Sequence, residues 1–230
     1  EQMRRQYQRG PIGTEWTTGA AGNTGDGIRA GLDLGAATGL MDDAWWGPSI
    51  LLPGGPYFCL AERSLPGCML VNGAGQRFVN ESAPYVDAVH AMYEGDTPEN
   101  PHIPAWLVFD QRYRDRYVFA GLPPRKALPR RWYAAGAVVK ADDLAGLASA
   151  AGVDADGLVK TVARFNEFAA AGKDSDFGRG DSAYDRYYGD PRLPNPNLAA
   201  LDRPPFYAVK VVPGDLGTKG GLVTDSRARV

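Results

Sequence analysis

A dense run of tyrosines and arginines is the first part of this sequence that could do chemistry. Between Asp110 and Tyr117, three arginines alternate with two tyrosines, Tyr113 and Tyr117. A tyrosine hydroxyl has an ordinary pKa of about 10, and nearby guanidinium charge favours tyrosinate and lowers that value. Such a tyrosine can remove a proton from a carbon next to a ketone. On the residues alone, a solvated surface helix with core-facing tyrosines is the stronger alternative.

Two glycine-rich segments could hold a ligand. Residues 23–27 (Asn-Thr-Gly-Asp-Gly) precede a helical pattern and would present free backbone N–H groups at the positive end of a helix. This arrangement suits a phosphate or an electron-rich ring, although an ordinary capped helix start explains it too. Residues 213–221 contain four glycines after a predicted strand, so their backbone could approach a flat ligand closely. The alternative for this segment is a long hairpin loop.

Other kinds of site find little support in the sequence. The two histidines, His90 and His102, are twelve residues apart and do not form a helical ligand pair, so we predict no metal site. No Gly-x-Ser-x-Gly elbow is present for a serine hydrolase. The two cysteines, Cys59 and Cys68, are interpreted as buried thiols of a cytoplasmic protein.

Composition indicates an ordinary globular protein. The 230 residues are 44% hydrophobic and 23% charged, which argues against disorder or a coiled coil. The 25 Lys and Arg nearly balance 27 Asp and Glu, so no nucleic-acid partner is expected. No apolar run approaches the roughly 20 residues that cross a membrane, so no transmembrane segment is expected. No signal-peptide pattern is present either.

Periodicity and turn residues predict the elements that must position these residues. Apolar residues at four-residue spacing predict a helix from residue 26 to 40, with Thr24 or Asp26 as its N-cap. Residues 41–67 are expected to be irregular, and residues 173–205 to be a long surface excursion. The other expected elements are a helix at 2–7, strands at 68–71 and 76–79 joined by a hairpin turn, strands at 105–109 and 206–212, a helix at 140–151, and a helix at 154–171 capped by Asp154 and Gly172.

Four motifs, taken in order, resemble the FAD-dependent fumarate reductase/succinate dehydrogenase flavoprotein superfamily. They lie at residues 23–27, at 77–81, at 164–166 together with 176–179, and at 217–221. Within this superfamily the sequence is most similar to the 3-ketosteroid Δ1-dehydrogenases. That similarity is carried by residues 113–121, 182–191 and 213–219, and the whole resemblance spans nearly all of the chain.

The resemblance implies an α+β fold, made of a capping or substrate domain and incomplete pieces of an FAD-binding α/β domain. The implied division is residues 1–67 for part of the FAD-binding domain, 68–205 for the capping domain and 206–230 for the return into the FAD-binding domain. The family's Gly-x-Gly-x-x-Gly and Tyr-Pro-Gly-Pro-Gly motifs are not found in these 230 residues. We therefore expect a fragment of a longer chain that is inactive alone and binds FAD weakly or not at all.

The implied activity is flavin-dependent 1,2-desaturation of 3-ketosteroids, a reaction of steroid metabolism and lipid degradation. A tyrosine takes a proton from C2, C1 gives a hydride to FAD, and an external electron acceptor reoxidises the flavin. Tyr117 fits the family's catalytic tyrosine best, and Tyr113 is the second choice. The residues that the resemblance assigns to the cofactor are Asn23, Thr24, Gly25, Asp26, Thr218, Gly220 and Gly221.

Two other functions remain open at this stage. One is a fumarate-reductase-like or Δ4-(5α)-ketosteroid enzyme of the same superfamily, although two histidines are few for clamping a dicarboxylate. The other is a non-catalytic, truncated binding module. Steroid turnover would separate the first from a Δ1-dehydrogenase, and flavin absorbance of the purified protein would separate the second from both.

Overall fold

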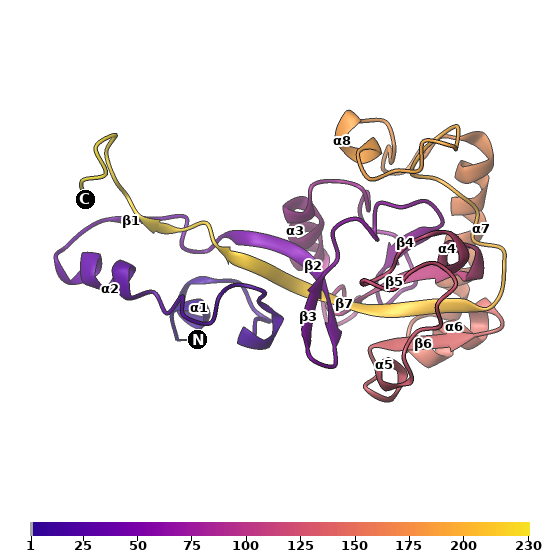
Figure 1. Ribbon diagram of the computed structural model, residues 1–230, viewed down its shortest axis with the longest axis horizontal. Coiled ribbons are helices and arrows are strands. Elements are labelled where there is room, and N and C mark those ends of the chain that lie inside the picture. Colours follow the sequence, from indigo (N-terminus) through magenta and orange to yellow (C-terminus); the bar gives the residue numbers. More distant parts are fainter. Residues whose placement is uncertain (1) are drawn as a thin grey trace.

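A six-stranded antiparallel sheet organises the fold, which the computed structural model describes over residues 2–230 (Figure 1). The strands, in their order across the sheet, are β3 (Gly55–Phe58), β2 (Ala44–Leu52), β7 (Phe206–Thr218), β5 (Ala105–Asp110) and β4 (Cys68–Val71), with β6 (Val138–Ala141) also paired to β7. Helices and antiparallel strands together confirm the expected α+β class.

Helices and a small second sheet complete the described part of the chain. The helices are α1 (Gln2–Tyr7), the 3-10 turn η1 (Thr14–Trp16), α2 (Asp26–Asp33), α3 (Tyr85–Gly95), α4 (Gln111–Arg116), α5 (Arg130–Ala134), α6 (Leu144–Ala151), α7 (Ala155–Ala171) and α8 (Ala183–Arg186). The second sheet pairs β1 (Thr38–Gly39) with β8 (Gly221–Leu222).

Strand β7 is long enough to join two regions of the molecule. Its first half pairs with β5 and β6, and its second half pairs with β2, up to the match of Ala44 with Thr218. Around and beyond that point α1, α2, β1 and β8 form a part that projects from the body, and the C-terminus lies there (Figure 1). One sheet thus contains strands from all three of the expected segments, and the division at residues 67 and 205 stays a prediction.

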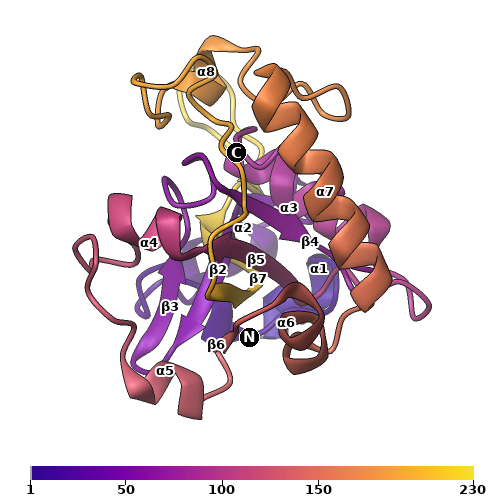
Figure 2. The same ribbon diagram turned by 90° about the vertical axis from the view of Figure 1, so that its right-hand side faces the viewer.

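The sheet buries both of its faces. Alternate residues of β5 point to opposite sides, so that Leu107 and Phe109 join one core cluster while Trp106 and Val108 join the other. The first cluster includes residues of α3, α4 and α5, and the second includes residues of α6 and α7. Figure 2 shows α7 along the outer side of the body. Burial on both faces explains why these strands read as continuous apolar runs in the sequence.

Several expected elements are confirmed. The strand at 105–109 is β5, and the helix at 2–7 is α1. The α7 helix has Asp154 as its N-cap, whose side chain accepts a bond from Gly157, and it ends at Gly172 in the left-handed conformation (φ 70°). The turn at 72–75 is also present, since Gly75 donates to the carbonyl of Asn72 at 2.9 Å.

Other expectations are wrong, mostly where glycine or proline suggested an interruption. Residues 41–67 contain β2 and β3, because a two-residue turn at Pro53 and Gly54 folds them into a hairpin, with positive φ at Gly54 and at Gly55, the first residue of β3. Pro213 does not end β7, since it lies opposite Pro48 in the ladder and the strand continues to Thr218. Residues 76–79 form only an isolated bridge from Arg77 to Val71.

Two helices are also shorter than expected. The helix at 26–40 ends at Asp33, and its N-cap is Gly25 rather than Thr24 or Asp26. The helix at 140–151 begins only at Leu144, because residues 138–141 pair with β7. In the second case the apolar pattern extends outside the helix because the neighbouring strand β6 is also largely apolar.

The segment 173–205 runs largely over the surface, as expected, and a buried ionic network ties it to the sheet. Glu81 is fully buried, and its carboxylate accepts two bonds of 2.8 Å from Arg77 and one of 3.0 Å from Arg179. Arg77 also pairs with Asp174 at 2.8 Å, and Arg179 donates to the carbonyl of Cys68 at 2.6 Å. Burial opposes ionisation, but the two guanidinium groups hold the pKa of Glu81 below its ordinary value.

Glu81→Gln tests how strongly this network stabilises the fold. The substitution keeps the shape but leaves two buried guanidinium groups without their shared carboxylate, so we expect a loss of about 3–5 kcal/mol in the free energy of unfolding. Urea denaturation followed by circular dichroism measures this loss.

Asp225→Asn is the matched control, because Asp225 pairs with Arg229 on the exposed surface and its replacement should leave the unfolding midpoint unchanged. A Glu81→Gln protein that unfolds at the wild-type urea concentration would contradict the role given to this network.

Candidate functional site

Helix α4 positions both candidate tyrosines directly after β5. Asp110 ends the strand, is fully buried, and caps α4 by accepting a bond of 3.0 Å from the backbone of Tyr113. Its other oxygen accepts bonds from the backbones of Asp202 and Arg203 at 3.1 and 3.0 Å. Tyr117 is the C-cap of this short helix. One carboxylate therefore fixes the helix and the end of the segment 173–205 against each other.

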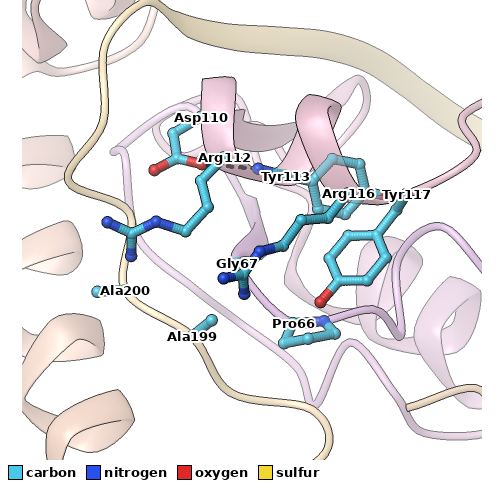
Figure 3. A pocket seen from close by; sticks show the side chains of 9 residues that line it. All are labelled: Pro66, Gly67, Asp110, Arg112, Tyr113, Arg116, Tyr117, Ala199 and Ala200. Carbon is cyan, nitrogen blue, oxygen red and sulfur yellow. Dashed lines mark hydrogen bonds between the residues drawn. The ribbon is translucent and has the colours of Figure 1, made fainter. Parts of the chain in front are cut away.

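A narrow pocket lies between α4 and two neighbouring loops (Figure 3). Its walls include Arg116 and Tyr117 from α4, Pro66 and Gly67 from the segment before β4, and Ala199 and Ala200 from the segment before β7, as well as Asp110, Arg112 and Tyr113. It has no room for a water-sized sphere. A substrate as large as a steroid therefore needs a surface beyond these walls.

The hydroxyl of Tyr117 donates a hydrogen bond of 2.8 Å to Asp190. Asp190 in turn accepts bonds of 2.8 and 2.7 Å from two nitrogens of the Arg192 guanidinium. Burial, and then the bond to this carboxylate, raise the pKa of Tyr117. The bonds from Arg192 hold the pKa of Asp190 well below its ordinary value. Tyr117 thus donates a hydrogen bond from its hydroxyl to a carboxylate, that of Asp190, which is itself paired with Arg192.

The expectation that three neighbouring arginines lower the pKa of Tyr117 is wrong. Arg112 pairs with Asp202 at 2.6 Å, and Arg114 is buried and donates to backbone carbonyls, including that of Tyr117 at 2.9 Å. Arg116 does favour tyrosinate, but its effect is smaller than those of burial and Asp190. Sequence neighbours on a helix point in different directions, so adjacency in the sequence did not place their charges on the hydroxyl.

Tyr113 lies in the core rather than at a site. It is 1% exposed, its hydroxyl donates to the carbonyl of Glu62 at 2.8 Å, and its ring packs against Phe109 with 4.8 Å between centroids. Burial raises its pKa well above the ordinary value. These contacts account for Tyr113 by packing, and the choice of Tyr117 as the catalytic tyrosine stays a prediction.

The first cofactor segment is at the start of α2. Gly25 adopts φ 81°, a left-handed conformation that favours glycine, and no side chain caps the first N–H groups of the helix. Thr24 donates to the carboxylate of Asp26 at 2.6 Å, and Arg29 pairs with the same carboxylate. Uncapped N–H donors and an exposed carboxylate acceptor suit the oxygens and hydroxyls of a dinucleotide, so Asn23 to Asp26 fit part of FAD.

The second cofactor segment, Thr218 to Gly221, lies where β7 ends. The Lys219 ammonium pairs with Asp43 at 2.9 Å, and its backbone donates to the carbonyl of Asp43 at 3.2 Å. A Cβ on Gly220 would overlap the carbonyl of Leu40, so this position admits only glycine unless the backbone moves. A Cβ on Gly221 would meet nothing within 4 Å, so its face is open to a ligand.

The two cofactor segments share the projecting part of the molecule, whereas the candidate tyrosines belong to its body (Figure 1). Helix α2 contacts β8, and a Cβ on Gly31 would overlap the side chain of Leu222. Side-chain bonds from the tyrosines reach Glu62 and Asp190 but neither cofactor segment.

Sequence reasoning missed Asp190, Arg192 and Asp43. Asp190 stands within residues 182–191, which carry part of the family resemblance, but it is 73 positions from Tyr117 and no local pattern joins the two. Asp43 is 176 positions from Lys219. Pairings at such distances along the chain need the fold.

Across residues 2–230, no helix is both long and apolar enough to cross a membrane. No group of three or more His, Cys, Asp or Glu residues in that range is arranged to hold a metal ion.

Curated relatives cover the whole chain. It is 60% identical to a 3-oxosteroid 1-dehydrogenase of Mycobacterium tuberculosis over 100% of its length, which is 42% of that protein. It is 43% identical over 90% of its length to a 4-oxocyclohexanecarboxylate 2-dehydrogenase of Sinomonas cyclohexanicum, 37% of that protein. The chain thus spans about two fifths of the curated relatives it matches.

A solved structure and a family model agree with these relatives. The 3-ketosteroid Δ1-dehydrogenase of Sterolibacterium denitrificans, solved in complex with 1,4-androstadiene-3,17-dione, matches all of this chain with a TM-score of 0.95 and 47% identity, over 42% of that structure. A flavocytochrome c3 fumarate reductase in an open conformation matches 90% of the chain with a TM-score of 0.61 and 26% identity, over 32% of that structure. The model of the FAD binding domain matches residues 2–230, and the chain belongs to this family.

Proposed function

We propose that this chain is part of an FAD-dependent enzyme that introduces a double bond between C1 and C2 of 3-ketosteroids. The observation that carries the proposal is the 60% identity, over the entire chain, to a protein named 3-oxosteroid 1-dehydrogenase. The ligand named for the related structure, 1,4-androstadiene-3,17-dione, has the 1,2 double bond that this reaction would make. A relative named for a smaller cyclic ketone further supports chemistry next to a ring carbonyl.

In this proposal Tyr117 is the catalytic base. The 3-keto group acidifies the C2 proton, and the tyrosinate oxygen takes that proton while the electron pair of the C2–H bond enters the developing enolate. FAD, when bound, accepts the hydride from C1. Both tyrosines border the pocket, and Tyr117 is preferred because its hydroxyl is bonded to the side chain of Asp190, while the Tyr113 hydroxyl is bonded to a main-chain carbonyl inside the core.

The segments Asn23–Asp26 and Thr218–Gly221 would hold FAD. The first offers the uncapped N–H groups of α2, and the second offers open backbone at Gly221. Asp43 would keep the second segment in place through its bonds to Lys219. An external electron acceptor completes the proposed cycle, and a cytoplasmic location agrees with two free, buried cysteines, Cys59 and Cys68.

Tyr117→Phe removes the proposed base and the hydrogen bond that its hydroxyl donates to Asp190. We expect kcat for a 3-ketosteroid to fall by about 10²–10⁴, because general base catalysis contributes that much. Dye reduction by the FAD-loaded protein, as its gene encodes it, measures the loss.

Tyr113→Phe is the paired control. It should leave turnover per folded protein unchanged and reduce the free energy of unfolding by about 1–3 kcal/mol, because the buried carbonyl of Glu62 loses its donor. If Tyr113→Phe abolished turnover and Tyr117→Phe did not, the assignment of the base would be wrong.

Gly221→Ala tests the cofactor segment without straining the fold. The added methyl group meets no protein atom within 4 Å, so the unfolding midpoint should be unchanged. If the flavin packs against this backbone, we expect about tenfold weaker FAD binding, since overpacking costs about 1–3 kcal/mol. Flavin fluorescence during titration of the apoprotein, as its gene encodes it, measures the affinity, and a wild-type affinity would remove Gly221 from the proposed site.

A fumarate reductase is the runner-up function. The chain is 31% identical over 93% of its length to a fumarate reductase (cytochrome) of Shewanella frigidimarina, which is lower than its identity to the steroid enzymes. Fumarate-dependent oxidation of reduced dye, without steroid-dependent dye reduction, would favour it.

A further inference from the structure

The partners of Tyr117 form a chain of contacts that the proposed reaction does not explain. Tyr117 donates to Asp190, which is held by two guanidinium bonds and by a bond of 3.1 Å from the backbone of Arg192. The Asp190 side chain is 4% exposed, whereas that of Arg192 is 75% exposed. The backbone of Asp190 also donates to Pro196 at 2.8 Å and accepts from Leu193 at 3.1 Å. The acceptor of the tyrosine hydroxyl is therefore fixed in side chain and backbone.

We propose that Asp190, held by Arg192, is a positioning residue that fixes the direction of the Tyr117 hydroxyl and decides whether its oxygen carries a proton when substrate arrives. The proposal rests on the proposed function for its catalytic meaning. A carboxylate at 2.8 Å can only accept, so it stabilises the protonated tyrosine and repels the tyrosinate. Asp190 itself is a poor proton acceptor because it is already ion-paired.

The other charged groups near Tyr117 are few, and most of them are bonded to other partners. Arg116 precedes it on α4 and favours tyrosinate. Asp110 and Arg112 border the same pocket, but they are bonded to backbone N–H groups and to Asp202 respectively. The Tyr113 ring lies edge-on at 5.3 Å, with its hydroxyl bonded to the Glu62 carbonyl. Among these groups, Asp190 is the acceptor that holds the proton on Tyr117.

Asp190→Asn removes the negative charge of this side chain and keeps its shape. The amide oxygen can still accept the tyrosine hydroxyl, so the ring keeps its direction, but the negative charge is gone. We expect Tyr117 to ionise about 1 pH unit lower, so that a larger share of it is tyrosinate at pH 11. Ultraviolet difference absorbance of tyrosinate measures this, with each protein compared with the same protein carrying Tyr117→Phe.

Asp202→Asn is the matched control. It removes the same charge from a residue on the neighbouring loop that pairs with Arg112, without touching the Tyr117 hydroxyl. Its Tyr117-specific absorbance at pH 11 should equal that of the wild type. An Asp190→Asn protein with no more Tyr117 ionisation at pH 11 than the wild type would overturn the proposal.

The pH profile of turnover gives a second readout that a purely structural role would not move. In Asp190→Asn the rising limb of kcat/KM should shift to lower pH by about 1 unit. The titration needs no turnover, so the two proposals can fail separately. If Tyr117→Phe stays active while the titration shifts, Tyr117 is not the base but Asp190 still controls its ionisation. If Tyr117→Phe is inactive and the titration does not shift, the role of Asp190 is wrong and the base stands.

Discussion

The fold of the body depends on a buried carboxylate shared by two arginines. Arg77 and Arg179 keep Glu81 ionised in the interior, and Glu81 gives both buried guanidinium groups a carboxylate, in addition to the one that Asp174 gives Arg77. Through Arg179 this cluster joins the segment 173–205 to β4 and to residues 63–65. The same segment carries Asp190, and it carries Ala199 and Ala200 at the pocket. The residues around Tyr117 therefore depend for their position on the buried ion pairs of Glu81.

Glu81 with its two arginines and Asp190 with Tyr117 and Arg192 rely on the same interaction, a buried carboxylate that is ion-paired, but with different results. In both, an ion-paired carboxylate is taken from water and its oxygens are fixed by several donors. At Glu81 the result is a rigid joint between segments far apart in sequence. At Asp190 one oxygen remains directed at a hydroxyl whose protonation matters for the proposed chemistry. A carboxylate with a fixed position and a fixed charge gives such a hydroxyl one orientation and one preferred proton state.

The sequence predicted those features that depend on interactions between residues close together in the chain, such as helix caps. The cap of α7 at Asp154 and its end at Gly172 were predictable because both act within one turn of helix. The continuation of β7 past Pro213 was not, since it depends on pairing with a strand more than 160 positions away. The α+β class was predictable from the family resemblance together with the expected helices and strands. The bond between Tyr117 and Asp190 was not predictable, because the two residues are far apart in the sequence. The local charge run around Tyr117 even suggested the wrong direction for its pKa, because burial and Asp190 outweigh Arg116.

The central claim, that Tyr117 removes the C2 proton, is tested most directly by isotope exchange. The FAD-loaded protein, as its gene encodes it, is incubated in deuterated water with a 3-ketosteroid whose A ring is saturated, and no electron acceptor is added. The recovered steroid is then analysed by mass spectrometry. If Tyr117 removes the C2 proton, the wild type introduces deuterium at C2 and Tyr117→Phe does so at no more than about one hundredth of that rate. Exchange at the wild-type rate in Tyr117→Phe would contradict it.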